Sequence, residues 1–175
     1  LKYYQVFNVA QTSNLPEVLV APELTKLEDK DRFEAADRLV HNNGVVIKHV
    51  SANSAHYEPQ NDIIQMPFLK QFSTTERYYA TLFHEVTHWT KHENRLQRPS
   101  GMFGTPEYAF EELIAELGSA FICARLQIHA SLSSSSAYIK SWLSALENDR
   151  KYILKAVSYA DKAMRYIFNE NNHQE

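Results

Sequence analysis

The sequence predicts an α+β domain in which a small N-terminal sheet precedes a helical body. Runs rich in aromatic and β-branched residues, which are typical of strands, lie upstream of Phe68. From Ser73 onward, apolar residues recur at helical spacing and capping residues mark helix starts. The chain of 175 residues contains only 4 glycines, which also favours helices.

The first third of the chain is expected to hold three strands and one helix. The strands are predicted at residues 2–9, 45–50 and 62–66. Residues 11–30, which contain Pro16 and Pro22, are predicted to be an irregular connection. The helix is predicted at residues 31–42, and Gly44 just beyond it suits a C-cap.

Two capping patterns predict where the long helices begin. Ser73 and Glu76 have the spacing of a capping box, so a helix is expected from there to about His92. Thr105 followed by Pro106 predicts a second helix, which we expect to end near residue 128. Two further helices are predicted at residues 137–148 and 150–169.

The charge balance excludes one class of function. The 18 Lys and Arg residues against 21 Asp and Glu give a net charge of −3, which argues against a domain that mainly grips nucleic acid through its own surface. The single cysteine, Cys123, cannot form an internal disulfide, so an oxidising compartment is not required. No apolar run approaches the roughly 18 residues of a membrane span, so no membrane association is expected.

The pattern HExxH stands in the first long predicted helix as His84, Glu85 and His88. Histidines at positions i and i+4 share one helix face, so both imidazoles can reach one metal ion. Glu85 lies beside them, where its carboxylate can take a proton from a water molecule at the ion. The alternative is a half-exposed helix that carries two histidines without function.

A third metal ligand is expected on the second long helix. Glu112, 24 residues after His88, begins the run Glu-Leu-Ile-Ala-Glu, which is similar to the third-ligand pattern of zincins that use glutamate. Glu112 would bind the ion, and Glu116 would accept the free N–H of a zinc-bound histidine. Glu111 is kept as a substitute ligand. The alternative interpretation of these acids is a solvated helix face.

His92 is the next candidate for the surroundings of the ion. A metzincin needs a glycine and a third histidine further along the helix, and the residues after His88 exclude that variant. His92 lies on the same predicted face as His88 but about 6 Å further along the helix. We therefore expect it to support the ligands or to cap the helix, and not to bind the ion.

The group that would stabilise an oxyanion is left open by the sequence. His56, Tyr57 and Tyr108 are candidates, because an imidazole or a phenol can donate the hydrogen bond required. The strand predicted at residues 62–66 could offer its edge to an extended peptide. The alternative is an ordinary buried strand.

At this point the chain resembles a known family, the C-terminal zincin-like metallopeptidase domain of ArdC-type antirestriction proteins. The resemblance is most specific in YYATLFHEVTHWT, residues 78–90, and YAFEELIAELGSAF, residues 108–121. Further similar stretches are residues 4–9, 62–67, 93–96, 103–104 and 138–143. One departure is Lys91, where the family pattern leads us to expect glycine.

The resemblance implies a zincin-like α+β fold, one Zn²⁺ ion, a polypeptide substrate of unknown identity and a cytoplasmic location. It implies that residues 1–10 are a junction strand after a DNA-binding domain and that residues 11–175 are the peptidase domain. Single-stranded DNA would bind that preceding domain. The first residue, Leu1, also leads us to expect a longer protein.

A second hypothesis is not enzymatic. The metal would brace a fold that binds a protein or DNA in DNA protection, with hydrolysis lost. Basic residues of the last predicted helix could then contact phosphate. They are Arg150, Lys151, Lys155, Lys162 and Arg165. The presence of Glu85 favours catalysis, because a structural metal site does not need a carboxylate that binds no metal.

Overall fold

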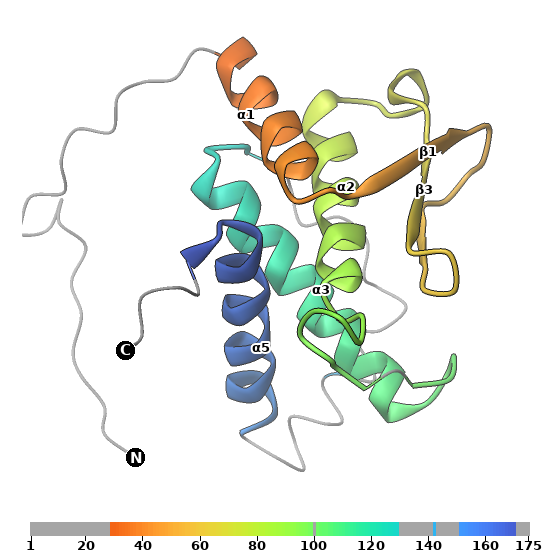
Figure 1. Cartoon of the computed structure of the whole chain (residues 1–175), viewed down its shortest axis with the longest axis vertical. Coiled ribbons are helices and arrows are strands. Elements are labelled where there is room, and N and C mark those ends of the chain that lie inside the picture. Colours follow the sequence, from red (N-terminus) through yellow and green to blue (C-terminus); the bar gives the residue numbers. More distant parts are fainter. Residues whose placement is uncertain (1–28, 100, 130–141, 143–150, 171–175) are drawn as a thin grey trace, which may run out of the picture.

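The structure, a computed structural model, describes residues 29–99, 101–129, 142 and 151–170 (Figure 1). Its helices are α1 (Asp29–Asn42), α2 (Thr75–Trp89), α3 (Pro106–Arg125) and α5 (Tyr152–Ile167). Its strands are β1 (Val46–Val50), β2 (His56–Glu58) and β3 (Ile63–Pro67), and a short 3₁₀ turn, η3, spans Leu69–Gln71. The predicted strand at residues 2–9 lies outside the described residues, as do residues 1–28 generally and all of the helix predicted at residues 137–148 except Trp142.

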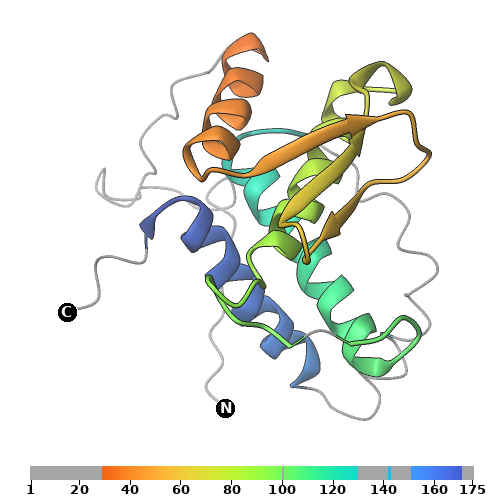
Figure 2. The same ribbon diagram turned by 45° about the vertical axis from the view of Figure 1, so that its right-hand side comes forward.

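The predicted α+β architecture is confirmed. The three-stranded sheet lies on one side of α2, α3 lies on the other side, and α5 packs against α3 (Figures 1 and 2). The helix expected at residues 31–42 is α1, and Gly44 follows it at φ 68° with its N–H 2.9 Å from the His41 carbonyl. None of the helices in the described segments is both long and apolar enough to cross a bilayer.

The strand order corrects one expectation. The order is β1-β3-β2, with β1 parallel and β2 antiparallel to β3. β3 therefore lies between two strands and cannot offer an edge to a peptide. Among the described strands, β2 forms the edge on the side of the metal site. The sequence pattern missed β2, because three residues are too short to show the alternation of a strand.

Helix α2 begins and ends at other residues than expected. Its N-cap is Thr74, whose side chain accepts from the N–H of Arg77 at 3.2 Å, so the predicted capping box of Ser73 and Glu76 does not form. The helix ends at Trp89 and not near His92, because the Thr90 hydroxyl donates to the Thr87 carbonyl at 2.6 Å. Consequently His92 does not share a helix face with His88.

Helix α3 starts as predicted and ends somewhat earlier. Thr105 is the N-cap, its side chain accepts from the N–H of Tyr108, and Pro106 occupies the first turn. The helix ends at Arg125, three residues before the expected end, and Gln127 then takes a positive φ of 58°.

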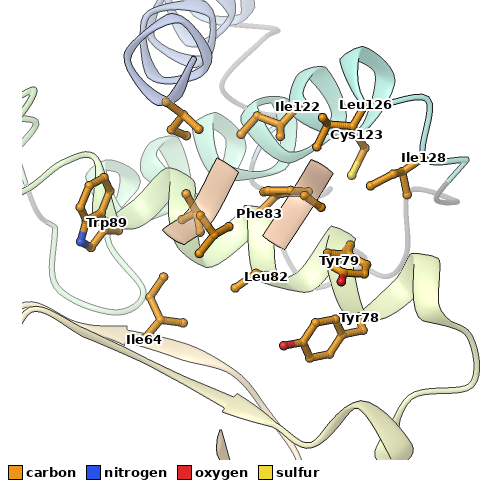
Figure 3. Close-up of a cluster of buried hydrophobic side chains, with 14 of the residues drawn as sticks. Ile64, Tyr78, Tyr79, Leu82, Phe83, Trp89, Ile122, Cys123, Leu126 and Ile128 are labelled. Atoms are coloured by element: carbon orange, nitrogen blue, oxygen red, sulfur yellow. The ribbon is translucent and has the colours of Figure 1, made fainter. Parts of the chain in front are cut away.

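Helix α2 is buried on both sides because it lies between the sheet and α3. Phe83, which has no exposed surface, lies on the side of α2 that faces Ile122 of α3, and Leu82 lies on the side that faces Ile64 of the sheet (Figure 3). Met66 and Val86 complete the centre of this core. A second cluster fills the space between α3 and α5, around Ile114 and two alanines of α5. This packing fixes the orientation of both helices that carry the candidate ligands.

The contact between α2 and α3 is closest at Gly118, as the small residues of α3 predicted. A Cβ atom at Gly118 would lie 2.5 Å from Cγ2 and 2.6 Å from Oγ1 of Thr87, which is itself fully buried. Nearby, the Ser119 hydroxyl donates to the Ala80 carbonyl of α2 at 2.7 Å. Thr87 is part of the HExxH segment, so this contact sets the distance between the two histidines and α3.

Replacing Gly118 by Ala should therefore destabilise the protein. In an unobstructed helix this change stabilises by about 1 kcal/mol, whereas here overpacking should cost about 1–3 kcal/mol. Urea unfolding of Gly118→Ala measures the difference. Thr87→Ala removes the two nearest atoms and leaves only Cβ at 3.1 Å, so Gly118→Ala should destabilise the Thr87→Ala variant less than it destabilises wild type. A higher melting temperature for Gly118→Ala alone would contradict the close contact.

Candidate metal centre

Three side chains from two helices converge as the sequence predicted. His84 and His88 lie one turn apart on α2, with ring centroids 4.8 Å apart and ring planes at 81°. Glu112 of α3 reaches between them, with Oε2 3.5 Å from His84 Nε2 and Oε1 3.3 Å from His88 Nε2. One ligand atom from each residue lies within 4.8 Å of the others. Two imidazole nitrogens and a carboxylate oxygen suit a divalent ion and leave a coordination position open.

A second carboxylate faces the other nitrogen of each imidazole. His84 Nδ1 lies 3.6 Å from Glu116 Oε1, and His88 Nδ1 lies 3.1 Å from Glu111 Oε1. Glu116 therefore lies on the Nδ1 side of His84, the side expected from the sequence, at a distance longer than a hydrogen bond. Glu111, considered as a substitute ligand, contacts Nδ1 of His88 and not the space between the two Nε2 atoms. Such carboxylate partners orient the ring and hold Nε2 toward a metal.

Arg98 completes this arrangement and was not found from the sequence. Its guanidinium donates to both oxygens of Glu111, at 3.0 Å from Nε and 2.8 Å from NH2. It also donates to the hydroxyl of Thr90 and the carbonyl of Thr87, each at 2.8 Å. The side chain is buried. Arg98 follows α2 in an irregular segment, so no periodicity or spacing in the sequence could indicate its partner.

The pKa values show that this cluster favours a positive charge between its carboxylates. Burial alone would lower the pKa of His88, but hydrogen bonds to Glu111 and Glu112 and the charge of Glu85 raise it to about 9. Burial would raise the pKa of Glu111, but His88 and Arg98 lower it to about 2. The two histidines hold the pKa of Glu112 well below its usual range despite burial. Groups that favour a cationic imidazole also favour a metal cation, so the donor set fits a divalent ion.

Glu85 is buried next to the histidines and does not converge with the three candidate ligands. It lines a cavity of about 340 Å³ that opens over His84, His88 and Glu112. The other residues that line this cavity are Ala55, His56, Tyr57, Lys91, Gly101, Tyr108 and Glu111. The cavity therefore places the Glu85 carboxylate beside the three candidate ligands but outside their converging group.

The three candidates for the oxyanion contact all line the cavity, but they differ in their contacts. The hydroxyl of Tyr57 donates to Asp62 at 2.7 Å and accepts from Arg95 at 3.1 Å. Burial and the hydrogen bond to Asp62 raise the pKa of Tyr57, so its proton is held tightly and directed toward Asp62. His56 and Tyr108 remain the better candidates.

His92 lies away from the ligands. It lines a neighbouring cavity of about 760 Å³, together with residues such as Gln60 and Gln97. Its Nδ1 accepts from the N–H of Asn94 at 3.2 Å. The expected contact with the metal ligands depended on continuation of α2, which ends at Trp89.

Comparison with known proteins finds relatives over most of the chain. The protein y4eC of Sinorhizobium fredii (strain NBRC 101917 / NGR234) is 39% identical over 161 residues, which cover 91% of this chain and 51% of that protein. A DNA primase TraC of Escherichia coli is 35% identical over 173 residues, which cover 97% of this chain and 12% of that protein. The chain thus spans about half of y4eC and a small part of TraC.

A solved structure is similar over nearly the whole chain. The crystal structure of the antirestriction protein ArdC from plasmid R388, in its Mn(II)-bound form, matches with a TM-score of 0.78 at 40% identity. The match covers 98% of this chain and 63% of that chain, and the metal-free form of ArdC matches with the same score. The profile of the family described as zincin-like metallopeptidase matches residues 34–159, which is more than half of the chain. The chain therefore belongs to the zincin-like metallopeptidase family.

Proposed function

We propose that this domain is a zinc-dependent peptidase in which His84, His88 and Glu112 hold one ion and Glu85 is the general base. The observation that carries the proposal is the pair of distances that join Glu112 to both Nε2 atoms, 3.5 and 3.3 Å, in a cavity that also contains Glu85. The similar ArdC structure is Mn(II)-bound, which supports the binding of a divalent ion by this domain. The choice of zinc rests on the two imidazoles and one carboxylate.

The roles of the side chains follow from where they lie. A zinc ion bound here would acidify a water molecule and polarise the substrate carbonyl. Glu85 takes the proton from the attacking water and later gives it to the leaving amine. Glu116 and Glu111 hold the two imidazoles in the tautomer that directs Nε2 inward. His56 or Tyr108 donates a hydrogen bond to the oxyanion.

An extended peptide would reach the cavity along β2. The strand that the sequence suggested for this role, β3, lies between two other strands. β2 runs from His56 to Glu58, pairs with β3 on one side, and contributes His56 and Tyr57 to the cavity. Among the described strands none pairs with its other side. A substrate strand could add there and so lay its backbone across the candidate metal site.

The setting of this activity is proposed from the relatives. ArdC is an antirestriction protein of a plasmid, and the chain covers 63% of it. We propose that the longer protein acts in the cytoplasm to protect incoming DNA from restriction. Single-stranded DNA would bind a domain that precedes this one, since the present chain is slightly acidic.

The alternative is a binding module that the metal only braces. Of the basic residues invoked for it, Arg165 is 2.8 Å from Asp161 and Lys162 lies over the ring of Tyr159, so both are engaged within α5. Arg150 lies outside the described residues. The buried carboxylate of Glu85, which binds no metal in the proposed site, favours the peptidase.

The two functions predict different results for two variants. Glu85→Gln should keep the metal content and the unfolding free energy, while cleavage of a pool of proteome-derived peptides should fall by about 10²–10⁴. His88→Ala should lose the metal and some stability, because metal binding energy contributes to folding. Mass spectrometry of the peptides measures cleavage, and elemental analysis of the protein measures metal content.

Glu76→Gln is the matched control, since Glu76 lies in the first turn of α2 outside the cavity. It should behave as wild type in both assays. The peptidase proposal fails if Glu85→Gln keeps full antirestriction activity while His88→Ala abolishes it. That outcome would assign the metal a bracing role.

The network around Arg98 should contribute to both stability and metal affinity. Arg98→Met leaves Glu111 buried without its main partner, so the free energy of unfolding should fall by about 3–5 kcal/mol. Adding Glu111→Gln removes the unpaired charge, so the double variant should regain part of the loss. Chelator competition should show metal affinity about 10–100-fold weaker than wild type in Arg98→Met.

Arg77→Met serves as the control, because Arg77 is an exposed arginine on α2 whose contact is with Ser73. Its unfolding in urea should match wild type. If Arg98→Met unfolded at the same urea concentration as Arg77→Met, the ion pair with Glu111 could not be the element that holds His88.

A further inference from the structure

Lys91 stands directly beside the candidate metal site. It follows Thr90, the C-cap of α2. Its backbone N–H donates to the His88 carbonyl at 2.9 Å, and its own carbonyl accepts from the N–H of Arg98 at 3.1 Å. The backbone of Lys91 is therefore fixed on both sides, three residues after a candidate ligand, and its side chain starts from a defined position.

Lys91 lines both cavities at the site. Tyr57 and Lys91 are the residues shared by the metal cavity of about 340 Å³ and the neighbouring cavity of about 760 Å³. A peptide that lies along β2 and crosses the candidate metal site passes this point. The residue of the substrate next to the scissile bond would then meet Lys91.

The ammonium group of Lys91 has no counter-charge among the described residues. No described carboxylate lies within 4.0 Å of it, and no described group forms a hydrogen bond with its side chain, although the residue is partly buried. Of the three acids that line the same cavity, Glu111 pairs with Arg98, Glu112 lies between the two histidines, and Glu85 forms no ion pair with Lys91. A carboxylate from a ligand could therefore pair with the ammonium group without displacing an existing partner.

The charges of the cavity also favour an anion. A divalent ion would be matched by Glu85 and Glu112, and Arg98 matches Glu111. Lys91 adds a positive charge where the two cavities meet, and Glu93, the acid that lines the larger cavity, forms no ion pair with it. A carboxylate of the substrate would pair with this charge, a basic residue would be repelled by it, and a neutral residue would leave it in its present surroundings.

We propose that Lys91 is a specificity-determining residue that binds a carboxylate of the peptide substrate next to the scissile bond. The carboxylate belongs to an Asp or Glu side chain or to the C-terminus of the peptide. This role rests on the peptidase function proposed above and adds the substrate class to it.

Binding of metal-directed probes to the zinc-loaded chain tests this role. One pair of peptide hydroxamates carries Glu or Gln next to the hydroxamate, and a second pair carries a free or an amidated C-terminus. Calorimetry should show that wild type prefers the carboxylate member of one pair by about tenfold. The pair that shows the preference identifies the source of the carboxylate.

Variants link the preference to Lys91. The preference should disappear in Lys91→Met and reverse in Lys91→Glu, and it should remain in Lys48→Met, which removes an exposed lysine of β1 outside both cavities. Lys91→Glu also provides a second test if Lys91→Met is poorly folded. The neutral probes should bind wild type and Lys91→Met equally.

Three results would overturn the assignment. Equal binding of the charged and neutral probes to wild type would remove the role of Lys91 and leave the peptidase function intact. Failure of every hydroxamate to bind the zinc-loaded chain would contradict both the role of Lys91 and the proposed peptidase function. Displacement of the probes by a single-stranded thymidine oligonucleotide that depends on Lys91 would assign the lysine to a phosphate and not to a peptide carboxylate.

Discussion

The close approach of α2 and α3 is the constraint on which the candidate site depends. The two histidines belong to α2, and the three carboxylates that surround them belong to α3. No Cβ atom fits at Gly118 against the buried Thr87, so the two helices lie at a distance that only glycine permits. The sheet and α5 pack on the outer sides of this pair and hold it in place. A site built from two packed helices is rigid before any metal binds.

Electrostatic balance is the second requirement of this arrangement. Three acids around two imidazoles would repel one another in a buried space, and Arg98 offsets part of that charge through Glu111. The same guanidinium donates a hydrogen bond to the carbonyl of Thr87 near the end of α2. It therefore connects the end of this helix with Glu111. Arg98 thus contacts the end of α2 directly and helps to orient His88 through Glu111.

The sequence predicted those parts of the structure that depend on local spacing. The histidine pair and the N-cap of α3 are set by residues within one helical turn, so both could be identified without tertiary information. The end of α2 could not, because the Thr90 hydroxyl and the Thr87 carbonyl that meet there are also held by Arg98, which lies nine residues beyond Trp89. The short edge strand β2 was missed for a related reason, since its pairing with β3 and not its own pattern defines it. The expectation that His92 supports the ligands or caps the helix required α2 to continue to His92, whereas α2 ends at Trp89.

The central claim is that one ion lies between His84, His88 and Glu112. Anomalous X-ray diffraction from crystals of the chain, purified without added metal and measured on both sides of the zinc absorption edge, tests it most directly. We predict a single zinc peak about 2.0–2.2 Å from Nε2 of each histidine and from a carboxylate oxygen of Glu112. A peak bound by Glu111 or Glu85 in place of Glu112, or ordered ligands without any anomalous peak after zinc is supplied, would contradict the account.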